Sequence, residues 1–167
     1  KLKEKNWKPD FGPQKVNVGA GATAIGAREF LIAYNINLNT NDRTYANEIA
    51  YELRERGRWK RINQKDNFYY KGNIVNFAEG YYPDGNSDYV GNSLKEIEDY
   101  YQKNGKDFRK RYNSLGLDPD NLIGKPVYKD GKFTHVKGLG WVIPEYNRAQ
   151  ISMNLTNYKI SSIFIIR

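Results

Sequence analysis

Apolar and polar residues alternate most regularly in two stretches that lie far apart along the chain. In residues 30–39 the apolar positions are Phe30, Ile32, Tyr34, Ile36 and Leu38. In residues 149–156 they are Ala149, Ile151, Met153 and Leu155. Because successive side chains of a β-strand point to opposite faces, this period of two predicts a strand in each stretch. We expect the apolar face of both strands to pack against helices.

The opposite face of both predicted strands is rich in carboxamides and hydroxyls. It carries Asn35, Asn37, Gln150, Ser152 and Asn154. If the two strands are neighbours, these side chains form a hydrogen-bonding floor that suits a polar ligand. The alternative is an ordinary solvent-facing surface, because antiparallel sheets often leave one face open to water.

A helical pattern follows the first predicted strand. Thr40 or Asn41 is placed to cap a helix, and Gly57 supplies its stop. Between them, one apolar stripe recurs at helical spacing: Ala46, Ile49, Ala50 and Leu53. A strand, a short turn and a helix make half of an α/β packing unit.

Shorter signals predict the remaining elements. Residues 139–143 form an apolar run that Pro144 stops, which is typical of a strand. Ser93 followed by Glu96 is a capping-box pattern at the start of a helix, and residues 107–115 fit a further helical turn or two. The apolar residues after Asn157 fit either a helix or an extended segment.

These elements predict an α/β (α+β) fold with a mixed or antiparallel sheet and helices on one face. A β-α-β-β-α-β layout would need one more strand, so we expect the sequence to end before its fold is complete. The first residue is Lys1 rather than Met, which also fits a fragment.

The amino-acid composition is different between Trp59 and Thr134. This part is rich in Asn, Asp, Gly and Lys, and its tyrosines include Tyr69, Tyr70, Tyr81, Tyr82, Tyr89, Tyr100 and Tyr101. We interpret it as a Tyr-rich insertion that packs as a lid over another surface. The expected organisation is therefore a first part of one subdomain at residues 1–58, an insertion at 59–134, and the second part of that subdomain at 135–167.

Net charge and composition limit the possible functions less than the alternation of apolar and polar residues does. The net charge is +8, and much of it lies in two basic runs, at residues 54–61 and 103–111. Such runs are commonly solvated helix faces, although the charge would also attract a polyanion. The sequence has no cysteine and no apolar run near the length that spans a bilayer, and no signal sequence opens it, so we expect a cytoplasmic protein.

No residue set resembles a complete catalytic centre. His135 is the single histidine, and its context favours a loop histidine over a general base. The glycines at 19–26 lack the residues that complete a phosphate-binding or dinucleotide-binding loop. Asp84, Asn86 and Asp88 lack the closing glutamate of a calcium loop. We therefore predict no catalytic residue in this chain and no metal site.

Three motifs, in order, resemble the C-terminal subdomain of glutamate formiminotransferase. They are Pro-Asp-Phe-Gly-Pro at 9–13, Gly-Ala-Thr-Ala-Ile-Gly-Ala-Arg at 21–28 and Phe-Leu-Ile-Ala-Tyr-Asn-Ile-Asn-Leu at 30–38. Two later motifs match as well, Lys-Gly-Leu-Gly-Trp at 137–141 and Ala-Gln-Ile-Ser-Met-Asn-Leu at 149–155. The Tyr-rich part departs from the family, in which a short basic connection often joins these strands.

The resemblance implies a ferredoxin-like fold and transfer of a formimino group from N-formiminoglutamate to tetrahydrofolate, a step of histidine degradation. The folate co-substrate would lie in a tunnel between two facing subdomains, with the catalytic histidine on the N-terminal one. Asn35, Asn37, Gln150, Ser152 and Asn154 would line that tunnel, and Arg28 would pair with a carboxylate or form a structural ion pair. The expected partners are folate, formiminoglutamate, the N-terminal subdomain and further copies in a homo-oligomer; the isolated chain is expected to be inactive.

Two other functions stay open. A related enzyme with the same fold could transfer a formyl group instead, since fold does not fix the donor. A basic, non-catalytic module that binds nucleic acid is the alternative from a different class, motivated by the net charge and the tyrosines, although no RNA-binding motif is present.

Overall fold

A three-stranded antiparallel sheet carries the two alternating stretches of the sequence. The computed structural model describes residues 7–62 and 72–166. Its largest sheet has the order β1-β9-β8, formed by β1 (Ile32–Asn37), β9 (Arg148–Leu155) and β8 (Val136–Ile143). Both outer strands are antiparallel to β9, so β1 and β8 run parallel with β9 between them. The three predicted strands are confirmed, and β8 is longer than expected.

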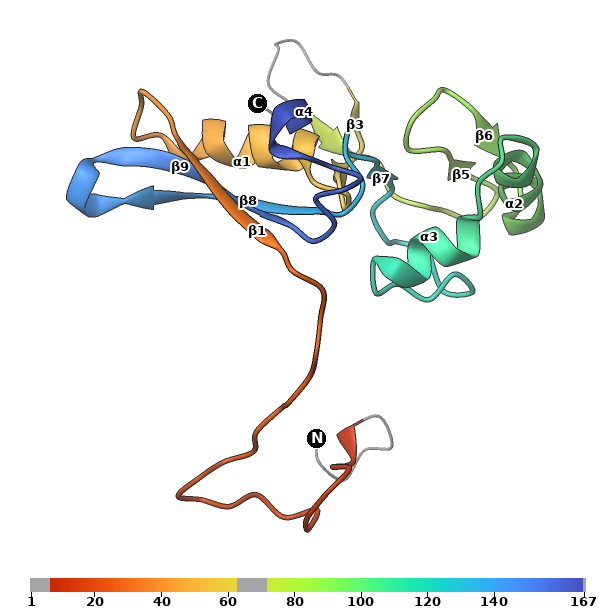
Figure 1. The fold of residues 1–167 in the computed structure, drawn as a ribbon. Coiled ribbons are helices and arrows are strands. Elements are labelled where there is room, and N and C mark those ends of the chain that lie inside the picture. Colours follow the sequence, from red (N-terminus) through yellow and green to blue (C-terminus); the bar gives the residue numbers. More distant parts are fainter. Residues whose placement is uncertain (1–6, 63–71, 167) are drawn as a thin grey trace.

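Helices cover one face of this sheet, as predicted. Helix α1 (Arg43–Leu53) packs against β8 and β9, and Ile166 of the short α4 (Ile163–Ile166) belongs to the same apolar cluster. The buried members of this cluster are Ala46, Ala50, Val136, Ala149, Ile151, Met153, Leu155 and Ile166. The chain is therefore a mixed α/β structure whose main core lies between a sheet and helices (Figure 1).

Three details of α1 differ from the prediction. Its N-cap is Asp42, whose side chain accepts a hydrogen bond from the Thr44 amide at 2.8 Å, whereas Thr40 accepts one from the Asp42 amide. The helix ends at Leu53, before Gly57. Ile49 is 38% exposed, so the apolar stripe is narrower than its spacing indicated.

The narrow stripe lets α1 lie unusually close to β8. A Cβ atom on Gly140 would collide with the backbone of Asn47 and Ala46 and would lie 2.8 Å from the Ala46 Cβ. The Gly140 amide also donates a hydrogen bond to the Asn47 side chain at 3.0 Å. Glycine in a strand often marks such an approach of a second backbone.

The tyrosine-rich part folds around a second apolar cluster. It contains the short strands β2 (Arg58–Trp59), β3 (Arg61–Ile62), β4 (Asn73–Ile74), β5 (Tyr82–Pro83), β6 (Val90–Gly91) and β7 (Tyr128–Lys129), and the helices α2 (Leu94–Lys103) and α3 (Phe108–Ser114). Ser93 caps α2 by accepting from the Glu96 amide, as predicted, and the buried residues of the helix are Ile97 and Tyr101. The predicted helix at 107–115 is α3.

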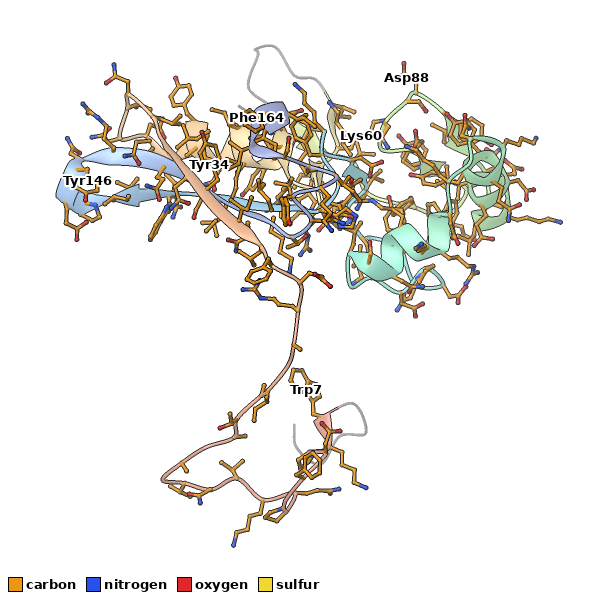
Figure 2. The ribbon with its side chains drawn as sticks, in the orientation of Figure 1. Trp7, Tyr34, Lys60, Asp88, Tyr146 and Phe164 are labelled. Atoms are coloured by element: carbon orange, nitrogen blue, oxygen red, sulfur yellow. The ribbon has the colours of Figure 1, made fainter. Side chains whose placement is uncertain are left out.

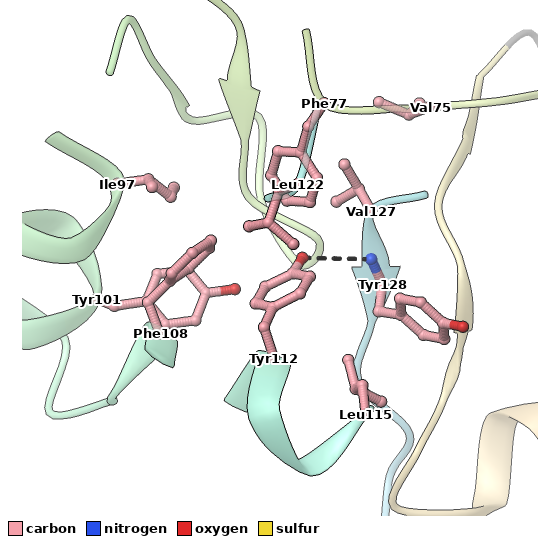
Figure 3. Close-up of a cluster of buried hydrophobic side chains, with 10 residues drawn as sticks. All are labelled: Val75, Phe77, Ile97, Tyr101, Phe108, Tyr112, Leu115, Leu122, Val127 and Tyr128. Atoms are coloured by element: carbon pink, nitrogen blue, oxygen red, sulfur yellow. Dashed lines mark hydrogen bonds between the residues drawn. The ribbon is translucent and has the colours of Figure 1, made fainter. Parts of the chain in front are cut away.

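Aromatic rings dominate this second cluster (Figure 3). Phe108 lies edge-on to Tyr101 and against Tyr112, with ring centroids 5.1 and 4.5 Å apart. The Tyr112 hydroxyl accepts a hydrogen bond from the Tyr128 amide at 3.4 Å. Burial raises the pKa of both Tyr101 and Tyr112, so these hydroxyls stay protonated.

The two parts are joined at the β2–β7 pair. Strands β2 and β7 pair antiparallel with Trp59 opposite Tyr128, so the chain leaves and returns at neighbouring positions. Lys60, labelled in Figure 2, donates to the backbone carbonyls of Asp84 and Ser87. Each part thus has an apolar cluster of its own, and the two clusters share no buried residue.

Replacing Gly140 by alanine should lower the free energy of unfolding by about 1–3 kcal/mol, because the new methyl group forces α1 away from β8. Gly138→Ala is the matched control, since its methyl would lie no closer than 3.6 Å to Ala50 and Met153. Urea denaturation of both variants measures the difference. Equal losses would show that the close approach is not what α1 depends on.

Candidate functional site

The predicted amide and hydroxyl residues lie together on the sheet face opposite α1. In the register, Asn35 is opposite Ser152, Asn37 is opposite Gln150, and Ala33 is opposite Asn154. Cross-strand partners point to the same side of a sheet, so all five candidates share one surface. We call this surface, made of Asn35, Asn37, Gln150, Ser152 and Asn154, the amide face.

The side-chain hydrogen bonds of the amide face all run from donor to acceptor in the direction from β8 through β9 to β1. Trp141 Nε1 donates to the Gln150 side-chain oxygen at 3.0 Å, and Gln150 Nε2 donates to the Asn37 oxygen at 2.7 Å. The Ser152 hydroxyl donates to the Asn35 oxygen at 2.8 Å. Both asparagine oxygens therefore accept from within the sheet, which leaves their NH₂ groups as the outward-facing donors. The surface is arranged to meet hydrogen-bond acceptors.

Strand β8 adds residues to this surface that the amide pattern did not reveal. Lys137 lies opposite Asn154 and Trp141 opposite Gln150, so both side chains share the amide face. Lys137 is exposed, and Trp141 is 46% exposed. A cation and an aromatic ring beside the carboxamides favour a flat ligand with negative or acceptor groups. The alternation of residues 136–143 could have revealed them, had the two facing glycines been counted as apolar positions.

Arg28 is not brought to the amide face. It is exposed in the segment before β1, which runs away from the sheet and has Trp7 at its far end (Figure 2). The Arg28 guanidinium donates to the Glu29 carbonyl at 3.3 Å. Its pairing with a carboxylate stays a prediction.

His135 lies at a turn before β8, where its backbone amide and carbonyl both form hydrogen bonds. Its φ of 57° is in the left-handed region, its amide donates to the Glu55 carboxylate at 2.8 Å, and its carbonyl accepts from Thr156. The main chain of His135 thus links the segment after α1 to the residue that follows β9. Such a role suits a loop histidine.

Asp84, one of the residues considered for calcium, has hydrogen-bond partners within the protein. Both Asp84 carboxylate oxygens accept hydrogen bonds, one from the Tyr101 hydroxyl at 2.8 Å and one from the Ser87 hydroxyl at 2.8 Å. Across residues 7–62 and 72–166, no group of three His, Cys, Asp or Glu side chains has the arrangement of a metal site. The same part of the chain contains no helix long and apolar enough to cross a membrane.

Fold and site together define an α/β domain with one helix-covered sheet face and one open, donor-rich face. Comparison with known families gives its relationship: residues 33–167 match the formiminotransferase domain. The chain belongs to this family.

Two relatives align with almost the whole chain. Formimidoyltransferase-cyclodeaminase of Dictyostelium discoideum is 30% identical over 166 residues, which are 99% of this chain and 18% of that protein. Glutamate formimidoyltransferase of Thermoplasma acidophilum is 29% identical over 163 residues, covering 98% of this chain and 29% of that protein. The chain therefore spans less than a third of the length of either relative.

A shorter stretch is more similar. Formimidoyltransferase-cyclodeaminase of Sus scrofa is 53% identical over 60 residues, which are 36% of this chain and 11% of that protein. Identity to this relative over a short stretch is therefore higher than the identity of the other two relatives over almost the whole chain.

Replacing Gln150 by leucine should lower the free energy of unfolding by about 1–2 kcal/mol, because the buried carboxamide links Trp141 to Asn37. Gln102→Leu on the exposed side of α2 is the control. Chemical denaturation followed by tryptophan fluorescence measures both variants. If the two variants unfold at the same denaturant concentration, the Gln150 link does not stabilise the sheet.

Proposed function

We propose that this chain is the folate- and substrate-binding half of a glutamate formimidoyltransferase. The enzyme transfers the formimino group from N-formiminoglutamate to N5 of tetrahydrofolate in histidine degradation. Membership of the formiminotransferase domain family supports this reaction. The observation that carries the binding role is the open amide face, whose outward donors are fixed by hydrogen bonds within the sheet.

In this proposal the amide face is one wall of a folate cleft. The Asn35 and Asn37 NH₂ groups donate to carbonyl, ring-nitrogen or carboxylate acceptors of the pterin and glutamate moieties. Asn154, whose side chain has no hydrogen bond within the described part of the chain, adds a further donor and acceptor, and Lys137 beside it favours a carboxylate. Trp141 offers a ring on which a flat pterin can stack.

The chemical step needs groups beyond this surface. The N5 lone pair attacks the formimino carbon, the carbon–nitrogen bond to glutamate then breaks, and the proton lost from N5 passes to the leaving nitrogen through a base. We propose that the base is a histidine of the N-terminal subdomain. The part played by this chain is to hold the two substrates in reacting geometry, which is itself a large contribution to rate.

The architecture is proposed to be ferredoxin-like. The order β1-β9-β8, with α1 between β1 and β8 in sequence, supports the first three strands and first helix of that layout, and α4 would be its second helix. Residues 1–58 and 135–167 would form the subdomain and residues 59–134 an insertion, a division supported by the separate aromatic cluster. A cytoplasmic homo-oligomer is the proposed state of the whole enzyme.

Asn154→Ala should weaken tetrahydrofolate binding by about threefold to tenfold, as expected for one lost hydrogen bond. The variant is made in the enzyme assembled with its N-terminal half, and calorimetry measures the affinity. Asn113→Ala, on the exposed side of α3, is the matched control. If Asn154→Ala binds as tightly as Asn113→Ala, the amide face is not the folate wall.

The isolated chain should show no formimino transfer, and adding the N-terminal half should restore it, because the proposed base lies there. A spectrophotometric assay of the folate product measures this, with N-formiminoglutamate and a formyl donor offered in parallel. Transfer by the isolated chain at a rate near that of the assembled enzyme would contradict the division of roles. Preference for the formyl donor would instead correct the substrate.

A further inference from the structure

A second candidate binding site lies on the helix side of the sheet, away from the amide face. It is a cavity of about 390 Å³ between α1 and the β2–β7 pair. Five arginines line it: Arg43, Arg54, Arg56, Arg58 and Arg61. We call this cavity the arginine pocket. Its volume falls in the range typical of small-molecule sites, about 300–1,000 Å³.

One of the five arginines is braced by carboxylates. Arg58 is 6% exposed, and its guanidinium lies 2.6 Å from the Glu48 carboxylate and 3.3 Å from that of Glu52. It also donates to the Glu48 carbonyl at 2.8 Å. This buried arrangement fixes one side of the pocket as part of the fold, and its charge is compensated locally.

Arg54 and Arg56 instead contact neutral groups. Arg54 donates to the carbonyls of Gly57 and Gly138 and lies over the Tyr51 ring at 4.2 Å. Arg56 donates to the Tyr128 hydroxyl at 3.3 Å and lies over that ring at 5.6 Å. These contacts orient the two side chains without neutralising them.

The remaining two arginines have still fewer partners. The Arg61 side chain donates to the Gly72 carbonyl, and the Arg43 side chain has no hydrogen bond or ion pair within residues 7–62 and 72–166. Each guanidinium carries five N–H donors, so most donors of Arg43, Arg56 and Arg61 are available to a ligand. The pocket therefore concentrates positive charge that its own carboxylates do not balance.

The backbone holds these charges close together. Gly57 has a φ of +68°, and a Cβ there would collide with the Lys129 carbonyl, so the turn that separates Arg56 from Arg58 is tightly packed. Burial lowers the pKa of Arg54, and the positive charges of Arg56 and Arg58 lower it further, while Tyr51 and Tyr128 oppose the shift. An anion among these groups would relieve the mutual repulsion.

We propose that the arginine pocket binds a small polyanion that carries two or more carboxylate or phosphate groups. Arg43, Arg56 and Arg61 supply the donors, because planar guanidinium groups bind both kinds of oxyanion bidentately. Arg58, braced by Glu48 and Glu52, keeps the wall in place. The basic run at residues 54–61 is thus a built binding site rather than a solvated helix face.

Calorimetry of the purified protein with citrate and with pyrophosphate, in the absence of folate, tests this inference. At least one of the two should bind, and Arg43→Gln and Arg56→Gln should each weaken that binding by about tenfold. The matched control is Arg148→Gln, which removes the same charge at the exposed start of β9. It should change the affinity less than about twofold, as expected for weak interactions between distant, screened surface charges.

The outcomes separate the possible ligands. Binding of citrate alone assigns the pocket to carboxylates, binding of pyrophosphate alone assigns it to phosphates, and binding of both supports the shared chemistry. No binding of either overturns the proposal, as does an equal loss in the Arg148→Gln control. Asn154→Ala should leave anion binding unchanged, so failure of the folate proposal and failure of this one are distinguishable. Circular dichroism confirms that each variant is folded.

Discussion

The close contact between α1 and β8 is the constraint on which the rest of this structure depends. Ala46 and Ala50 on the helix meet Gly138 and Gly140 on the strand, and Gly140 leaves no room for a side chain. With small residues on both sides, the helix lies flat on the sheet and buries its apolar face there. The amide face opposite stays open, because both helices of this core pack on the other side. The same approach holds Arg54 near the edge of β8, where it donates to Gly138.

The aromatic cluster depends little on that contact. Its buried residues come from positions 75–128, and it joins the sheet part at the β2–β7 pair. Tyrosines there pack through their rings while their hydroxyls find specific partners, as Tyr101 does with Asp84. This explains how a segment with so many polar residues forms a core. Trp59 and Tyr128, which pair where the two parts join, also form one wall of the arginine pocket.

Period-two alternation was enough to predict β1 and β9 and to place the amides of each strand on one face, because side-chain direction in a strand follows from sequence position alone. The pairing of β1 with β9 then brings the two rows onto one surface. Capping chemistry likewise predicted the start of α2 at Ser93. The predictions that were wrong depended on contacts between residues far apart in the sequence. Ile49 fits a helical stripe but is exposed, because α1 meets β8 along a seam of alanines. Asp42, not Thr40 or Asn41, caps α1, because the chain turns after Thr40 pairs with Ala149. The arginine pocket was hidden because Tyr128, far along the sequence, completes it.

The two candidate sites differ in how far hydrogen bonds and carboxylates within the protein satisfy their polar groups. We therefore expect the two sites to bind different classes of ligand. On the amide face the Asn35 and Asn37 oxygens each accept a hydrogen bond from a neighbour in the sheet, so neutral NH₂ donors face outward, with Lys137 on the same face. Such a surface can bind a largely neutral ring system without a large cost of desolvation. In the arginine pocket the uncompensated groups are full charges beside aromatic rings, which favour an anion over a neutral ligand. We therefore expect a ligand with a flat polar ring to bind the amide face and a ligand with clustered negative charges to bind the arginine pocket, on the opposite side of the same sheet.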